Sequence, residues 1–137
     1  MRKTSTQIER DVFRIVKSCM NGSIGGGVYR KGMRPKDSDK EDCVVAFLSG
    51  MEGQLQSGEV YVHIYVPYTS AGCRSALIPD IARIEQLEVK LTELLMELGN
   101  DSEYLFSYRS TPSTVELEDI RQSQLSALIT YERYIFI

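Results

Sequence analysis

The residues best suited to chemistry lie between positions 22 and 45, in the stretch GSIGGGVYRKGMRPKDSDKEDCVV. Gly22 and Ser23 could form a turn whose backbone amides hold a triphosphate. Asp37 and Asp39 could hold a magnesium ion between their carboxylates. Together they would suit a magnesium-dependent transfer of a nucleotidyl group. The competing interpretation is an extended loop that joins two strands and carries no reaction.

The spacing of these residues favours the loop. Thirteen residues separate Ser23 from Asp37, a long gap for the glycine-serine turn and paired carboxylates of nucleotidyltransferases. The run DSDKED at 37–42 is hydrophilic at every position, whereas metal-binding carboxylates on a strand would alternate with apolar residues. Solvated carboxylates on a loop do not offer the rigid geometry that Mg²⁺ prefers. We therefore expect a solvent-exposed charge run, formed by Asp37, Asp39, Glu41 and Asp42.

Other chemistry-bearing residues show no recognised pattern. GSIGGG is not followed by GK[ST] and does not begin a helix, so its glycines predict a tight turn or a close backbone approach rather than a phosphate site. Cys73 lies beside Arg74, which could lower the pKa of the thiol, but no base accompanies it. Three cysteines without a CxxC pair and a single histidine disfavour both a disulfide framework and a zinc site. We expect no catalytic residue, no cofactor and no metal.

The composition indicates one ordinary globular domain over residues 1–137. Hydrophobic residues make up 42% of the chain, charged residues 26%, and the formal net charge is −3. This balance does not suit a polybasic protein that binds nucleic acid. No apolar run approaches the roughly 20 residues that span a bilayer. The opening MRKTSTQIERDVF lacks the apolar core of a signal peptide, so we expect neither a membrane nor a secreted location.

The periodicities predict an α+β domain in the order α-β-β-β-α-β-β. Apolar residues at helical spacing indicate an amphipathic helix that Thr6 and Glu9 cap, and a second that begins after Asp80. Glycine-containing connections favour hairpins, so we expect a twisted, mostly antiparallel sheet of about five strands with both helices on one face. The expected helices are 6–20 and 80–98, the strands 24–30, 43–49, 59–67, 104–109 and 125–137, and the extended loops 31–42 and 110–124.

Two groups of residues predict a contact surface. EVYVHIYVP at 59–67 alternates strictly, so that Tyr61, His63 and Tyr65 share the face opposite the valines. An aromatic second face is suited to a partner, with His63 as an interface residue rather than a general base. The loop adds mixed charges that suit pairing with another copy. The predicted interface residues are Arg34, Lys36, Asp37, Asp39, Tyr61, His63 and Tyr65.

The stretch from GGGVYRKGMRP through EDCVVAFLSG to GEVYVHIYVPY resembles small tail-completion and tail-terminator-like proteins of bacteriophages and prophages. The similarity covers the arm and strand VYR…RP…S…EDCVV, the strand ending in IYVP, and the following long helix and two strands. Residues 110–124 match nothing in that family. The order of helices and strands is also similar to the tail-terminator fold.

The resemblance implies a structural role without catalysis. Family members form a ring, commonly a hexamer, that caps the tail tube and joins it to the head-side connector. The implied partners are the chain itself, tail-tube and connector proteins, in the host cytoplasm or the virion tail. Two alternatives stay open: a small magnesium-dependent nucleotidyltransferase using residues 22–42, and a binding module with a pocket at the loop PYTSAGCRS.

Overall fold

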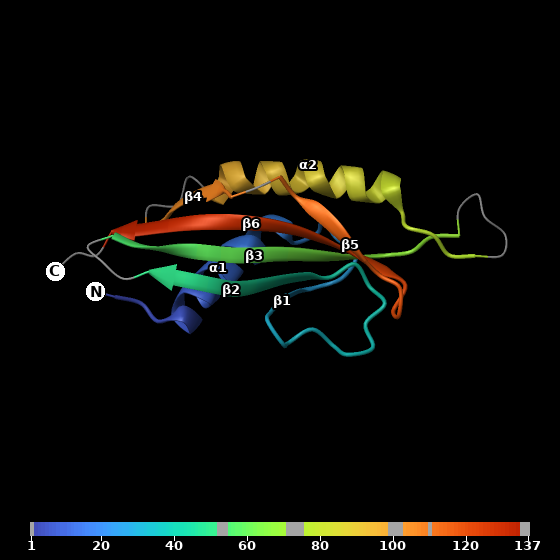
Figure 1. Ribbon diagram of the computed structural model, residues 1–137, viewed down its shortest axis with the longest axis horizontal. Coiled ribbons are helices and arrows are strands. Elements are labelled where there is room, and N and C mark those ends of the chain that lie inside the picture. Colours follow the sequence, from blue (N-terminus) through green and yellow to red (C-terminus); the bar gives the residue numbers. More distant parts are fainter. Residues whose placement is uncertain (1, 52–54, 71–75, 99–102, 110, 135–137) are drawn as a thin grey trace.

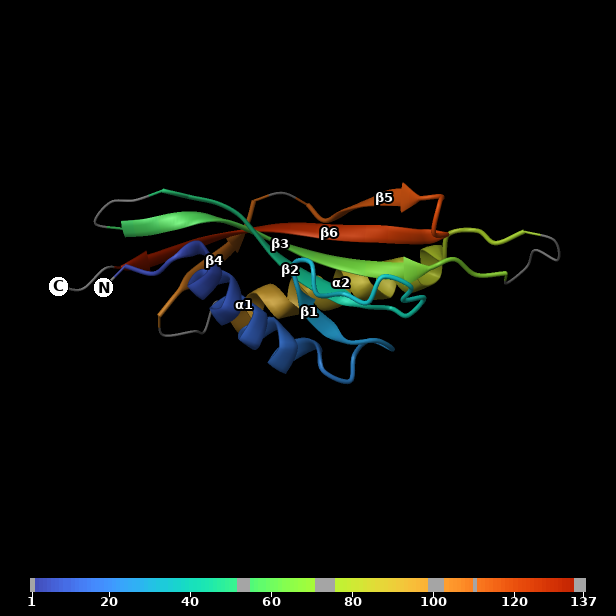
Figure 2. The same cartoon turned by 90° about the horizontal axis from the view of Figure 1, so that it is seen from below.

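The computed structural model describes residues 2–51, 55–70, 76–98, 103–109 and 111–134. Within them the chain forms two layers, a twisted six-stranded sheet and a pair of helices (Figure 1). Figure 2 shows both helices on the same side of the sheet. The α+β class with two helices on one face is therefore confirmed.

The two longest strands, β3 and β6, form the centre of the sheet. They pair antiparallel over their whole length, from Leu55 opposite Tyr134 to Pro67 opposite Gln122. The sheet order is β1-β2-β3-β6-β4, and β5 pairs with the part of β6 that β4 leaves free. The strands are β1 (Val28–Arg30), β2 (Cys43–Met51), β3 (Leu55–Pro67), β4 (Leu105–Tyr108), β5 (Ser113–Leu117) and β6 (Gln122–Tyr134).

The helices α1 (Ser5–Met20) and α2 (Ile81–Leu98) begin at capping residues. The capping box of α1 uses Thr4 and Gln7, so the predicted pair Thr6 and Glu9 is wrong. Glu9 instead accepts hydrogen bonds from Arg30 and from the backbone of Phe47, which fastens the helix to the sheet. Asp80 caps α2 as predicted, because its carboxylate accepts the N–H of Arg83.

The core lies between the helices and one face of the sheet. Alternate residues of β3 and β6 point into it, and the apolar stripes of α1 and α2 cover them. Removing these side chains from water supplies the main stabilisation of the two-layer arrangement. The core includes Ile8, Val12, Val16, Val62, Ile64, Leu87, Leu91, Leu94, Leu125, Ala127 and Ile129.

Two details of the predicted sheet are wrong. The strand expected at 24–30 shortens to β1 and pairs parallel with β2, because the loop after it returns the chain in the same direction. The expected loop 110–124 contains β5 and the start of β6, which pair as a hairpin, so the described sheet has six strands rather than five. The polar composition of residues 110–124 gave no sign of this hairpin, since almost all of β5 faces solvent and needs no apolar side chains.

Candidate functional site

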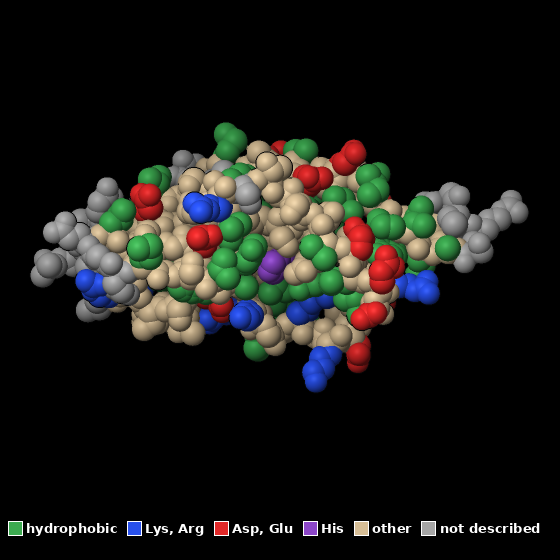
Figure 3. Space-filling view, in the orientation of Figure 1, with side chains coloured by type: hydrophobic (Ala, Val, Ile, Leu, Met, Phe, Trp, Pro, Cys, Tyr) green, Lys and Arg blue, Asp and Glu red, His purple; other side chains and the backbone are tan. Residues whose placement is uncertain are grey.

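The face of the sheet opposite the helices is the candidate site, and we call it the open face. The alternation of β3 sends Val60, Val62 and Ile64 into the core and leaves the other row on the open face. That row holds Tyr61, His63 and Tyr65, which are half-buried among their neighbours. Figure 3 views this side, with the histidine in purple near its centre and apolar side chains around it. The predicted shared face of these three residues is confirmed.

A hollow of about 250 Å³ opens at the centre of this face. The rings of Tyr61 and His63 stack along one side of it, with centroids 5.0 Å apart and planes 20° from parallel. His63 Nδ1 lies 2.6 Å from Ser126 Oγ, a short hydrogen bond across the central strand pair. The hollow is lined by Tyr61, His63, Ser113, Val115, Ser126 and Leu128.

Strand β5 supplies the wall of the hollow that sequence reasoning missed. Ser113 and Val115 project beside Ser126 and Leu128 because β5 pairs with β6. The available signal was the alternation in STVEL together with a polar turn before the next apolar run. That signal is short, and a strand exposed on both sides carries no continuous apolar face to mark it.

The environment of His63 favours the neutral form of its imidazole ring, which makes a hydrogen bond. Burial lowers its pKa below the ordinary value, because the charged imidazolium loses water. Among the described residues, its hydrogen-bond partner is the hydroxyl of Ser126, and no carboxylate orients the ring. A serine-histidine pair without that third group lacks the usual arrangement for nucleophilic catalysis. The hollow therefore presents a pair of stacked rings and hydrogen-bonding groups at the surface of the sheet.

Arg34 forms one border of the open face. Its guanidinium lies over the ring of Tyr65, with the central carbon 4.0 Å from the ring centroid. Its nitrogens also donate to Asp42, to the side chain of Gln122 and to the carbonyls of Ser38 and Lys40. The loop 31–42 is therefore folded around one arginine, which lies at the border of the aromatic row.

Asp42 is the buried centre of this loop. Its side chain has no exposed surface and accepts bonds from the Gly27 N–H at 2.9 Å, from Arg34 Nε at 2.9 Å and from the Ser38 hydroxyl. Burial opposes its ionisation, but these three donors outweigh burial and hold the pKa of Asp42 below its usual value. The expectation of a solvated charge run is wrong at this residue, because the loop folds over it.

Close packing explains Gly26, one of the glycines before β1. A Cβ added at Gly26 would overlap the carboxylate of Asp42 and lie 2.6 Å from the Glu41 carbonyl, whereas one at Gly25 would meet no atom of the described residues within 4 Å. The predicted close backbone approach is confirmed at Gly26.

The end of the loop 31–42 is joined to α2 by an ion pair of 2.7 Å between Glu41 and Arg83, which raises the pKa of Arg83.

The remaining predicted interface residues lie on the outer surface of the loop. Lys36, Asp37 and Asp39 are exposed, in contrast to Arg34. Among the described residues, no three His, Cys, Asp or Glu side chains gather into a metal site. The backbone carbonyl of Ser23 accepts a hydrogen bond from the Arg83 guanidinium. The predicted pocket at PYTSAGCRS includes residues 71–75, Cys73 among them, which lie outside the described residues.

The chain matches no protein-family model and no curated protein sequence. Neither of the described helices has the length and apolar character needed to cross a membrane.

Proposed function

We propose that this chain is a non-enzymatic structural protein of a phage or prophage tail. In this role it assembles as a ring, like the commonly hexameric rings of the family it resembles, that completes the tail tube and joins it to the head-side connector. The observation that carries the proposal is the open face, where stacked Tyr61 and His63 border a hollow that the chain's own helices leave uncovered. Large aromatic side chains in such a position are typical contact residues.

The loop 31–42 supports a structural role. Its one buried carboxylate, Asp42, is already satisfied by three donors. The two carboxylates of the nucleotidyltransferase interpretation, Asp37 and Asp39, are exposed on the loop rather than fixed on a strand. A loop pinned from inside by Arg34 can present those outer charges in a fixed position, which favours specific pairing between subunits.

Electron microscopy and sedimentation of the purified chain test the proposal. We expect rings of one defined stoichiometry, since a closed heterologous assembly stops at a fixed number of subunits. Genes for a major tail protein and a head-tail connector should lie beside the gene for this chain. Neighbouring genes of another class, together with a monomer at every concentration, would contradict the tail role.

A thermal-shift measurement distinguishes the structural role from the nucleotidyltransferase alternative. A nucleotidyltransferase binds magnesium and a nucleoside triphosphate in its folded state, so these ligands would raise its melting temperature by mass action. For a structural protein we expect no shift. A shift that Asp37→Asn and Asp39→Asn abolish would restore the nucleotidyltransferase interpretation.

A further inference from the structure

Strand β5 has one neighbour in the part of the chain that the structure describes. That neighbour is β6, so the outer edge of β5 lies at the margin of the described sheet. Four of its five residues are exposed, and Val115 leaves 57% of its surface in water. An edge strand offers unpaired N–H and C=O groups to another chain, and a strand that buries neither face is marginal by itself.

At the opposite margin of the sheet, one part is protected against pairing with another chain and one part is not. The distal half of β2 carries a register shift between Phe47 and Ser49, and Glu9 accepts the Phe47 N–H at 3.2 Å. A bulge and a capping side chain are devices that discourage pairing with another chain. β1, at the other end of this margin, pairs with β2 on its inner side, and the described residues provide neither device on its outer side.

The strand directions make these two margins compatible. β1 runs parallel to β2, and each following step from β2 through β3 and β6 to β5 is antiparallel. β5 therefore runs opposite to β1. If a second copy continues the sheet in the same orientation, its β1 lies antiparallel to β5 of the first copy, which is the pairing that sheets form most readily.

The charges of the two margins are complementary. Near β5, the side chains of Glu116, Glu118 and Asp119 are exposed, and Figure 3 shows acidic side chains gathered over this hairpin. Beside β1, Lys31 is exposed, and α1, which packs on β1, presents Arg14 to solvent. Opposite charges on the two margins steer association.

Residue faces agree with the same arrangement. Tyr29 of β1 is in register with Val44, which is in register with His63, so Tyr29 belongs to the open face. Val115 of β5 lies on that face as well, at the wall of the hollow. Joining the two edges would therefore join the open faces of neighbouring copies into one surface.

We propose that β5 of one copy pairs antiparallel with β1 of the next copy of this chain, in a head-to-tail contact. The inference rests on the proposed function, because it names the contact through which a ring would close. The contact is heterologous, so each subunit uses both edges and the assembly grows until it closes.

An introduced charge pair tests the contact. In an antiparallel pairing, Lys31, which follows β1, lies beside Ser113 at the start of β5. Ser113→Lys therefore places like charges side by side, and we expect it to weaken the association constant by roughly threefold to tenfold at low salt. Adding Lys31→Glu to Ser113→Lys should restore association, because opposite charges then lie side by side. The matched control is Glu85→Lys on α2, which is exposed and away from the two paired backbones. Sedimentation over a concentration series measures the constant, and circular dichroism checks folding.

The outcomes separate this inference from the proposed function. Weakening by Ser113→Lys with recovery in the double variant supports both. Weakening by Ser113→Lys that Lys31→Glu does not relieve would indicate β5 pairing with β5 across a two-fold axis, and would overturn the head-to-tail contact. A wild-type oligomer that Ser113→Lys leaves unchanged would overturn the contact alone. A wild-type chain that stays monomeric throughout would overturn the contact and the ring together.

Discussion

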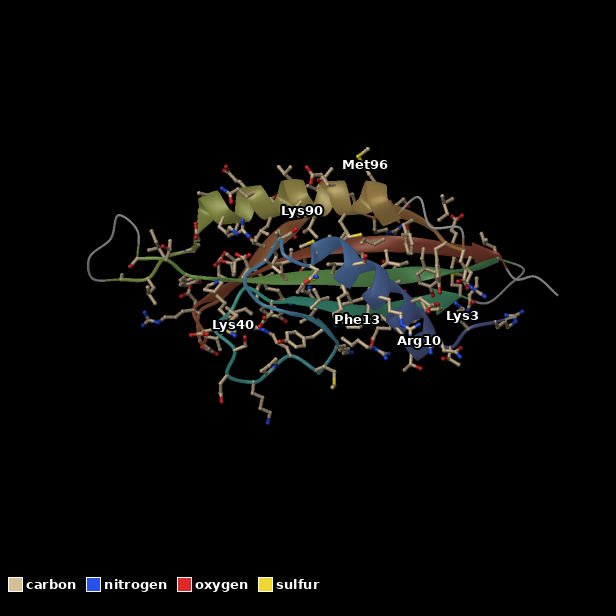
Figure 4. The ribbon with its side chains drawn as sticks, turned by 180° about the vertical axis from the view of Figure 1, so that it is seen from behind. Lys3, Arg10, Phe13, Lys40, Lys90 and Met96 are labelled. Carbon is tan, nitrogen blue, oxygen red and sulfur yellow. The ribbon has the colours of Figure 1, made fainter. Side chains whose placement is uncertain are left out.

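Arg34 and Asp42 form an ion pair of 2.9 Å beneath the surface of the loop 31–42. The Asp42 side chain is fully buried, and that of Arg34 exposes 14% of its surface. The same guanidinium stacks on Tyr65, so one arginine joins the loop to the aromatic row of the open face (Figure 4 shows this loop from behind, with Lys40 labelled). The fold of the loop and the shape of the open face therefore depend on the same pair.

Replacing Arg34 by alanine should destabilise the chain strongly. The change leaves Asp42 buried without its cation, and breaking a buried pair in this way costs about 3–5 kcal/mol. Urea denaturation measures the difference in the free energy of unfolding. Lys36→Ala is the matched control, because Lys36 is an exposed neighbour on the same loop, and we expect a change within about 0.5 kcal/mol. Equal effects of the two variants would show that the pair does not hold the loop.

Acid should remove the contribution of Asp42 to stability. Its folded pKa is depressed, so its stabilisation is complete above the unfolded value near 3.8 and is lost as pH falls through the lower folded value. Asp11 and Glu103 have pKa values lowered by Lys3 and act in the same window. Asp42→Asn should be less stable than wild type at neutral pH and show a flatter dependence below pH 4. Asp39→Asn, on the exposed part of the loop, should keep the wild-type slope.

His63 is a direct probe of the open face, because it is the one histidine in the sequence. Its pKa, measured by NMR, should lie below 6.5, since burial penalises the imidazolium. A lowered pKa in a base means that the unfolded chain binds more protons, so stability should fall as pH drops through about 6.5. His63→Gln should remove this slope. A pKa above 6.5 would show that the ring is exposed or paired with a carboxylate.

The sequence predicted the faces of β3, but it predicted neither the burial of Asp42 nor the strand β5. Alternation in 59–67 predicted the faces of β3 because a period of two leaves a single choice of inward row. The same reasoning treated Asp42 as solvated because its neighbours are hydrophilic. Burial of a charge depends on a partner that only the folded loop brings near, here Arg34. Similarly, β5 is held by β6 rather than by its own apolar pattern.

The glycine pair before β1 offers the sharpest structural test, because two adjacent residues should respond differently to one added methyl group. Gly26→Ala would place a Cβ against the Asp42 carboxylate and the Glu41 backbone, and the backbone cannot yield as the end of a flexible side chain can. Overpacking of this kind costs about 1–3 kcal/mol, and displacement of Asp42 from its donors would add to it. Gly25→Ala meets open space, so we expect no loss and a small gain from the stiffer unfolded chain. Chemical denaturation of both variants measures the difference, and similar stabilities would mean that the turn of residues 25–27 does not press against Asp42.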